Sequence, residues 1–99
     1  MNIENYRISN LSEEEIEKKV ENEYCALIVE YTNKKGVFCV ESHTPRIRGS
    51  FAYGKTVCFR HWCLPFSRMS EYKHWFLCNK KERKELMALL EENHRSNSI

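Results

Sequence analysis

Apolar residues recur every four positions at the start of the chain, a spacing that predicts an amphipathic helix over residues 13–23. The recurring positions are Ile16, Val20 and Tyr24. Ser12 and Glu15 have the spacing of a capping box, in which each side chain accepts a hydrogen bond from a backbone N–H at the helix start. We therefore expect the helix to begin directly after Ser12.

Two stretches of β-forming residues flank a polar turn between residues 25 and 43, which predicts an antiparallel hairpin. The turn is expected at residues 33–36. A four-residue loop places large apolar residues of both arms on one face, namely the facing pairs Tyr31/Phe38 and Val29/Val40 together with Leu27. We expect this face to be core, and the opposite face to carry Glu30, Thr32, Glu41 and His43.

A second hairpin is predicted with arms at residues 47–53 and 56–64. Gly54 and Lys55 would form its two-residue turn, with glycine at the position that a type II′ turn requires. The facing residues of this register include the pairs Phe51/Cys58, Ile47/Trp62, Ala52/Val57, Ser50/Phe59 and Arg48/His61. Both faces of this hairpin then carry aromatic rings and cations.

The rest of the chain predicts a strand end and a final helix. Pro65 should end the second hairpin, and residues 70–78 are compatible with either a short helix or a further strand. Asn79 and Glu82 form a second N-cap signature, followed by leucines on one face of a helix that ends near His94.

These elements predict one small α+β domain over residues 1–99. We expect an antiparallel meander of four or five strands, with the N-terminal and C-terminal helices packed on one face. The opposite sheet face would then be open to a partner. Residues 1–10 and 95–99 have no periodic pattern, and we expect them to be loosely ordered.

Apolar runs and cysteines indicate the compartment. The longest apolar run, residues 25–29, is far shorter than the roughly 20 residues that cross a bilayer, so we expect no membrane partner and a cytoplasmic location. The five cysteines are an odd number, which favours free thiols over disulfides in such a chain.

Charge is distributed unevenly along the sequence. Residues 1–24 hold seven Glu against three Lys or Arg, whereas residues 44–78 hold six Lys or Arg against one Glu. All 14 acidic residues are Glu. Because Asp is the usual ligand of catalytic Mg²⁺, its absence argues against magnesium-dependent phosphoryl transfer and two-metal nuclease chemistry.

The basic stretch interleaves cations with aromatic rings, a composition that suits contact with a protein or stacking on unpaired bases. The expected partner-binding residues are Arg46, Arg48, Tyr53, Lys55, Arg60, Trp62, Arg68 and Lys73. The alternative is that these rings fill the core while the cations line a solvated edge.

Two other site chemistries remain open. A structural zinc ion would use Cys58, Cys63, His74 and Cys78, although their spacing matches no common zinc-finger pattern. Metal-independent RNA cleavage would use His43, His61 and His74 as acid and base groups. Neither a glycine-rich phosphate loop nor a paired-carboxylate signature accompanies them, so the sequence favours no catalytic residues and no cofactor.

These observations together favour a non-enzymatic binding protein that engages a protein or a nucleic acid through a basic and aromatic sheet surface. A short chain rich in Lys, Glu and Asn also fits a phage or mobile-element inhibitor of a host enzyme that handles nucleic acids. The alternatives are an RNA-cleaving protein of toxin-like type and a zinc-stabilised interaction module.

Overall fold

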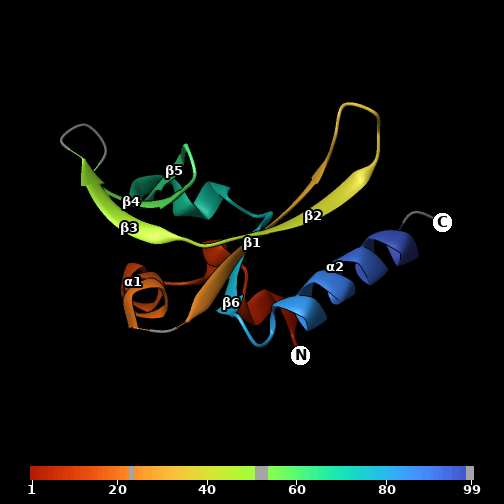
Figure 1. Cartoon of the computed structure of the whole chain (residues 1–99), viewed down its shortest axis with the longest axis horizontal. Coiled ribbons are helices and arrows are strands. Elements are labelled where there is room, and N and C mark those ends of the chain that lie inside the picture. The colour runs from red at the N-terminus through yellow and green to blue at the C-terminus, as the bar shows by residue number, and fades with distance from the viewer. Residues whose placement is uncertain (23, 51–53, 98–99) are drawn as a thin grey trace.

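The computed structural model describes residues 1–22, 24–50 and 54–97. Over these residues the chain forms two antiparallel three-stranded sheets, ordered β2-β1-β6 and β3-β4-β5 (Figure 1). The strands are β1 (Cys25–Thr32), β2 (Phe38–His43), β3 (Arg46–Ser50), β4 (Gly54–Phe59), β5 (Trp62–Pro65) and β6 (Trp75–Asn79). The helices are α1 (Glu13–Asn22) and α2 (Arg83–Asn97), with short 3-10 helices η1 (Ile3–Asn5), η2 (Ile8–Asn10) and η3 (Phe66–Glu71). The α+β class is confirmed, with more strands than the sequence predicted.

Helix α1 begins as the capping box predicts. The Ser12 N–H donates to Glu15 Oε1 and the Glu15 N–H donates to Ser12 Oγ, both at 3.1 Å. Ile16 is fully buried, and Val20 packs against the same cluster. Tyr24, in contrast, lies beyond the helix and is 73% exposed, with the Lys80 ammonium 4.1 Å from its ring centre.

Strands β1 and β2 form the expected hairpin, but their register is one residue away from the predicted one. Tyr31 lies opposite Cys39 and Val29 opposite Glu41, because the turn contains five residues instead of four. The extra residue is held by Asn33, whose N–H donates to the Val37 carbonyl at 2.9 Å and whose side chain accepts from the Val37 N–H at 3.0 Å. A slip of one residue moves side chains to the other face.

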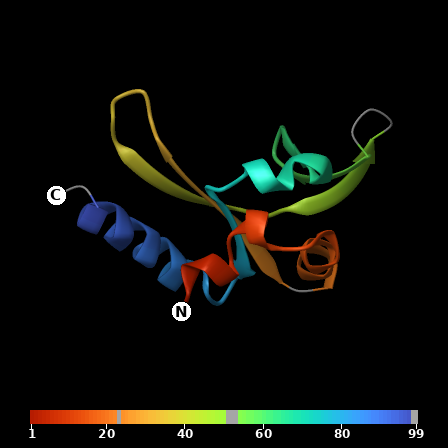
Figure 2. The ribbon, with the colours of Figure 1, turned by 180° about the vertical axis from the view of Figure 1, so that it is seen from behind.

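Two core clusters cover both faces of the sheet β2-β1-β6. Leu27 and Leu77 face a cluster that also contains Ile16 of α1 and residues of the second sheet and η3. The neighbouring residues on β1 and β6 face Leu86 and Leu90 of α2 on the other side. The expectation that both helices cover one face is therefore wrong, since α1 and α2 lie on opposite faces (Figures 1 and 2). The continuous apolar run of β1 is the physical reason, because a one-faced strand would alternate.

The N-terminal segment packs more closely than the sequence suggested, and the C-terminal helix is longer. Ile8 is fully buried, and the Leu77 N–H donates to the Tyr6 carbonyl at 2.8 Å. Helix α2 continues to Asn97, beyond the predicted end near His94. Residues 95–97 are helical but exposed, so the expectation of loose order at residues 1–10 and 95–99 stays a prediction. None of the helices in these described ranges is long and apolar enough to span a membrane.

The second hairpin turns at a different place from the predicted one. Ser50 pairs with Gly54, so Gly54 begins β4, and the predicted pairs Ile47/Trp62, Ser50/Phe59 and Arg48/His61 do not form. The pairs predicted for Phe51 and Ala52 involve residues outside the described ones. The observed register aligns Ile47, Val57 and Leu64 on the core face. Burial of these three residues explains why this register replaces the predicted one.

The predicted arm over residues 56–64 is in fact two strands. Arg60 and His61 form a two-residue turn that reverses the chain, so that Phe59 of β4 lies opposite Trp62 of β5. Arg60 adopts a positive φ of 48°. Pro65 ends β5 as predicted, and residues 75–79 adopt the strand alternative.

The side chains of Asn79 and Glu82 form the expected reciprocal hydrogen bonds, but in the turn between β6 and α2: Asn79 ends β6, α2 begins at Arg83, and the first helical bond runs from the Leu86 N–H to the Glu82 carbonyl. The Lys81 N–H donates to Asn79 Oδ1 at 2.9 Å, and the Asn79 N–H donates to Glu82 Oε1 at 3.2 Å.

Burial on both faces of β1 predicts that two adjacent residues are equally intolerant of truncation. Leu27→Ala and Ile28→Ala should each lower the free energy of unfolding by about 2–5 kcal/mol, because both side chains are fully buried. Urea unfolding followed by circular dichroism measures this. Val37→Ala, at a residue that is 55% exposed, is the control and should change stability by less than about 0.5 kcal/mol. Tolerance of either core substitution would contradict two-faced burial.

Candidate binding groove

A hollow of about 270 Å³ lies where the first hairpin meets the turn between β4 and β5, and we call it the aromatic groove. Five of its lining residues carry rings, namely Tyr31, His43, Phe59, Trp62 and Trp75. The remaining lining residues are Val29, Glu41 and Arg60. The groove therefore brings together residues from β1, β2, β4, β5, β6 and the β4–β5 turn.

The register of the strands explains how these rings meet. Val29 of β1 lies opposite Trp75 of β6, and Phe59 lies opposite Trp62 across the tight turn. The Phe59 ring centre is 5.2 Å from that of Trp75 and 4.7 Å from that of His43. Phe59 is only 4% exposed, whereas Trp62 is 68% exposed. Phe59 therefore forms the floor of the aromatic groove and Trp62 forms its rim.

The Glu41 carboxylate is the centre of the polar contacts on one side of the groove. The Tyr31 hydroxyl donates to Glu41 Oε1 at 2.5 Å, and His43 Nε2 lies 3.3 Å from Glu41 Oε2. The bond from Tyr31 lowers the pKa of Glu41, and His43 and Arg60 lower it further. The same bond raises the pKa of Tyr31 to about 12. The groove thus holds an ionised carboxylate at neutral pH, close to the Arg60 cation.

The structure brings some of the predicted partner-binding residues to this region. Arg60 and Trp62 line the groove. Arg46 approaches the same turn, since its Nη2 donates to the Arg60 carbonyl at 3.4 Å. Arg48 is exposed on β3, two residues from Arg46 and hence on the same sheet face.

Other residues that were predicted to bind a partner make contacts away from the groove. Lys55 forms an ion pair with Glu17 of α1. Arg68 pairs with Glu71 at 2.8 Å within η3. Lys73 is exposed, and its carbonyl accepts a hydrogen bond from Arg7. Tyr53 lies outside the described residues.

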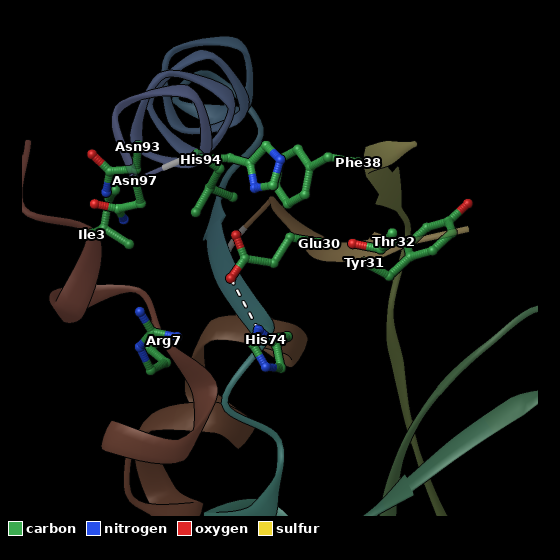
Figure 3. Close-up of a pocket in the computed structure, with 11 residues that line it drawn as sticks. Ile3, Arg7, Glu30, Tyr31, Thr32, Phe38, His74, Asn93, His94 and Asn97 are labelled. Atoms are coloured by element: carbon green, nitrogen blue, oxygen red, sulfur yellow. Dashed lines mark hydrogen bonds and ion pairs between the residues drawn. The ribbon is translucent and has the colours of Figure 1, made fainter. Parts of the chain in front are cut away.

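A second hollow of about 450 Å³ lies between the N-terminal segment, β1 and α2 (Figure 3). His74 Nδ1 lies 3.1 Å from Glu30 Oε1 on its wall. Arg7 also faces this hollow, but its guanidinium donates to Glu4, at 2.9 Å from Nε, and to the Lys73 carbonyl. Its donors therefore tie the N-terminal segment to the fold. The sequence did not predict this hollow, because Glu30 belongs to no recognisable motif and Arg7 lies in a segment without a periodic pattern of apolar residues.

The proposed zinc ligands do not come together. Cys58 and Cys63 are neighbours across β4 and β5, but Cys78 packs beneath α2 and His74 lines the second hollow. Within residues 1–22, 24–50 and 54–97, no group of three or more His, Cys or Glu side chains is placed to hold a metal ion. The zinc set predicted from the sequence is thus not assembled in this fold.

The histidines considered for RNA cleavage are also distributed over different places. His43 lines the aromatic groove, His74 lines the second hollow, and His61 lies in the β4–β5 turn. The structure therefore does not gather these three imidazoles in one pocket.

Comparison of the chain with protein-family models, with curated proteins and with solved structures finds no match. Inferences about function therefore rest on the geometry of the groove and its surroundings.

The bond between Tyr31 and Glu41 makes a pH-dependent prediction. The folded-state pKa of Tyr31 is about 12, above its ordinary value of 10.0, so the bond stabilises the fold below pH 10 and this contribution is lost as pH rises through 12. Phenolate absorbance during alkaline titration should lose a late-ionising tyrosine in Tyr31→Phe. Glu41→Gln should move the late ionisation toward lower pH because the charged acceptor is gone. Loss of a tyrosine that ionises near pH 10 in Tyr31→Phe, together with an unchanged curve in Glu41→Gln, would show that the bond is absent in solution.

Proposed function

We propose that this protein is a non-enzymatic binding module that seats a side chain of a partner protein in the aromatic groove. The observation that carries this proposal is the exposure of Trp62, 68% of whose surface is open to solvent on the rim of a hollow floored by Phe59. A large exposed ring beside a ready-made apolar hollow is the arrangement of a binding site.

The energetics of association support this use of Trp62. Tryptophan and arginine are enriched among residues whose truncation costs most binding energy, and Arg60 adjoins Trp62 in the groove. Rings also bury a large area while losing few rotatable bonds. The Phe59 and Trp75 rings are already in contact, so little ordering is needed there when a partner side chain enters.

The charges around the groove favour a protein over a nucleic acid. Glu41 places a carboxylate inside the groove, where it would repel a phosphate. Lys55 and Arg68 are neutralised by Glu17 and Glu71. In the described part of the chain, Arg46, Arg48 and Arg60 form no salt bridge. Arg60 borders the groove, whereas Arg46 and Arg48 lie on the other face of the second sheet, opposite Cys58 and Thr56 on the neighbouring strand. This combination suits an apolar side chain flanked by acidic residues of a partner.

A binding module of this kind acts by covering a functional surface of its partner protein. An inhibitor of a host enzyme that handles nucleic acids, encoded by a phage or mobile element, acts in this way. The composition of the chain favours that role, and acidic groups of the partner would meet Arg60 at the groove.

Substitution of Trp62 tests the proposed groove. Immobilised protein is used to capture partners from extracts of the native host, and the captured proteins are identified by mass spectrometry. Trp62→Ala should weaken binding of the captured partner by about thirtyfold or more, the effect of losing about 2 kcal/mol at an interface hot spot. Tyr24→Ala is the matched control, because Tyr24 is another exposed ring, at 73%, outside the groove. Equal binding by both variants would contradict the proposal.

Charge reversal tests the exposed arginines, and nuclease treatment separates the two classes of partner. Arg46→Glu, Arg48→Glu and Arg60→Glu combined should weaken binding, and added salt should weaken it further, since these cations are exposed. The fold should persist in the triple variant, as checked by circular dichroism. Capture that survives nuclease treatment of the extract identifies a protein partner. Capture that is lost after nuclease treatment would show that the partner is a nucleic acid and would overturn the protein assignment.

A further inference from the structure

The sheet β3-β4-β5 carries a pair of cysteines on the face opposite its core. Cys58 of β4 and Cys63 of β5 are direct cross-strand partners, one step from the two-residue turn. Their Sγ atoms lie 2.8 Å apart, and both thiols are free. Cys58 is 1% exposed, whereas Cys63 is exposed. One thiol of the pair is thus accessible from solvent while the other lies directly behind it.

The backbone already has the geometry that a disulfide requires. Facing residues in an antiparallel pair have Cα atoms about 4.5 or 5.5 Å apart, depending on the type of pair. Both separations fall within the range of about 4.4–6.8 Å found across disulfides. Cys25 and Cys78 do not share this arrangement, because their side chains belong to the two core clusters on opposite faces of their sheet.

Neighbouring groups influence the protonation and the hydrogen bonding of the two thiols. The hydrogen bond with Cys58 raises the pKa of Cys63, and burial raises it further, while Thr56 and Arg46 act in the opposite direction. The Thr56 hydroxyl lies 3.1 Å from Cys58 Sγ and donates to or accepts from it. At neutral pH the Cys63 thiol is therefore mostly protonated, while the Arg46 cation favours its thiolate when it forms.

We propose that Cys58 and Cys63 are a redox-active dithiol that forms a reversible disulfide across β4 and β5 by exchange with a small disulfide such as glutathione disulfide. This inference does not rest on the proposed binding function, because it requires no partner protein and because Cys58 and Cys63 lie on the face of the hairpin away from Phe59 and Trp62, a face that Arg46 and Arg48 share.

The exchange proceeds in two steps. The accessible Cys63 thiol loses its proton to solvent, and its sulfur attacks one sulfur of glutathione disulfide, which breaks that S–S bond and releases one glutathione thiolate. The Cys58 sulfur, after losing its proton, then attacks Cys63 Sγ in the mixed disulfide and releases the second glutathione. The two protein thiols are oxidised by two electrons, and the glutathione disulfide is reduced to two thiols that take up the two protons.

Trypsin offers a direct readout, since it cleaves after Lys55, Arg60 and Arg68. The native, reduced protein is incubated with glutathione disulfide, the remaining thiols are alkylated, and the chain is then unfolded and digested without reductant. Peptides 56–60 and 61–68, which carry one cysteine each, should appear as one linked species that separates after reduction. Reduced glutathione added before alkylation should reverse the link.

Two cysteine variants serve as comparison. Cys63→Ser should abolish the linked species, whereas Cys39→Ser, at a half-buried cysteine of β2, should leave it unchanged. Circular dichroism checks that both variants are folded. Glutathione retained on Cys63 while Cys58 remains alkylatable would overturn the proposal, as would a dominant link of either cysteine to Cys39.

Discussion

Strand β1 is the element on which the rest of the structure depends, because it is paired along both edges and buried on both faces. It pairs with β2 on one side and with β6 on the other. Its consecutive residues Cys25, Ala26, Leu27, Ile28 and Val29 are all buried. Alternate side chains enter two different cores, so a single strand joins α1 and the second sheet to α2. Burial of this run removes apolar side chains on both faces of one strand from water, which favours the folded state.

The end of this burial also creates the groove. Beyond Val29 the strand leaves the core, and Tyr31 is 38% exposed. Tyr31 and Phe59 of the second sheet line the same hollow. The groove therefore forms where β1 leaves the core beside the second sheet. Apart from Arg60 of the β4–β5 turn, its lining residues belong to strands.

Local signals in the sequence predicted local structure well. The capping residues Ser12 and Glu15 fixed the start of α1, because a capping box uses contacts between residues close in sequence. The similar contacts of Asn79 and Glu82 form the turn that precedes α2. The hairpin registers were not predictable in the same way. One depended on the side chain of Asn33, which extends the turn to Val37, and the other on which residues reach a core built from distant segments.

The candidate site was predictable only in part. Arg60 and Trp62 were found from their residue types, because exposed rings and cations suit binding. Tyr31 and Glu41, however, were assigned to opposite faces of the first hairpin, and only the observed register places them within hydrogen-bonding distance. Residues of the groove that come from separate strands are visible as a group only once the sheets are assembled.

The backbone of Arg60, which borders the aromatic groove, is conformationally strained. A residue with a side chain at a φ of 48° carries steric strain of about 1 kcal/mol, which glycine would not carry. The strained conformation holds Phe59 and Trp62 opposite each other while the arginine side chain borders the groove. Conformational strain at this turn is thus coupled to the shape of the groove, so that a more relaxed turn would yield a more stable chain with a poorer surface.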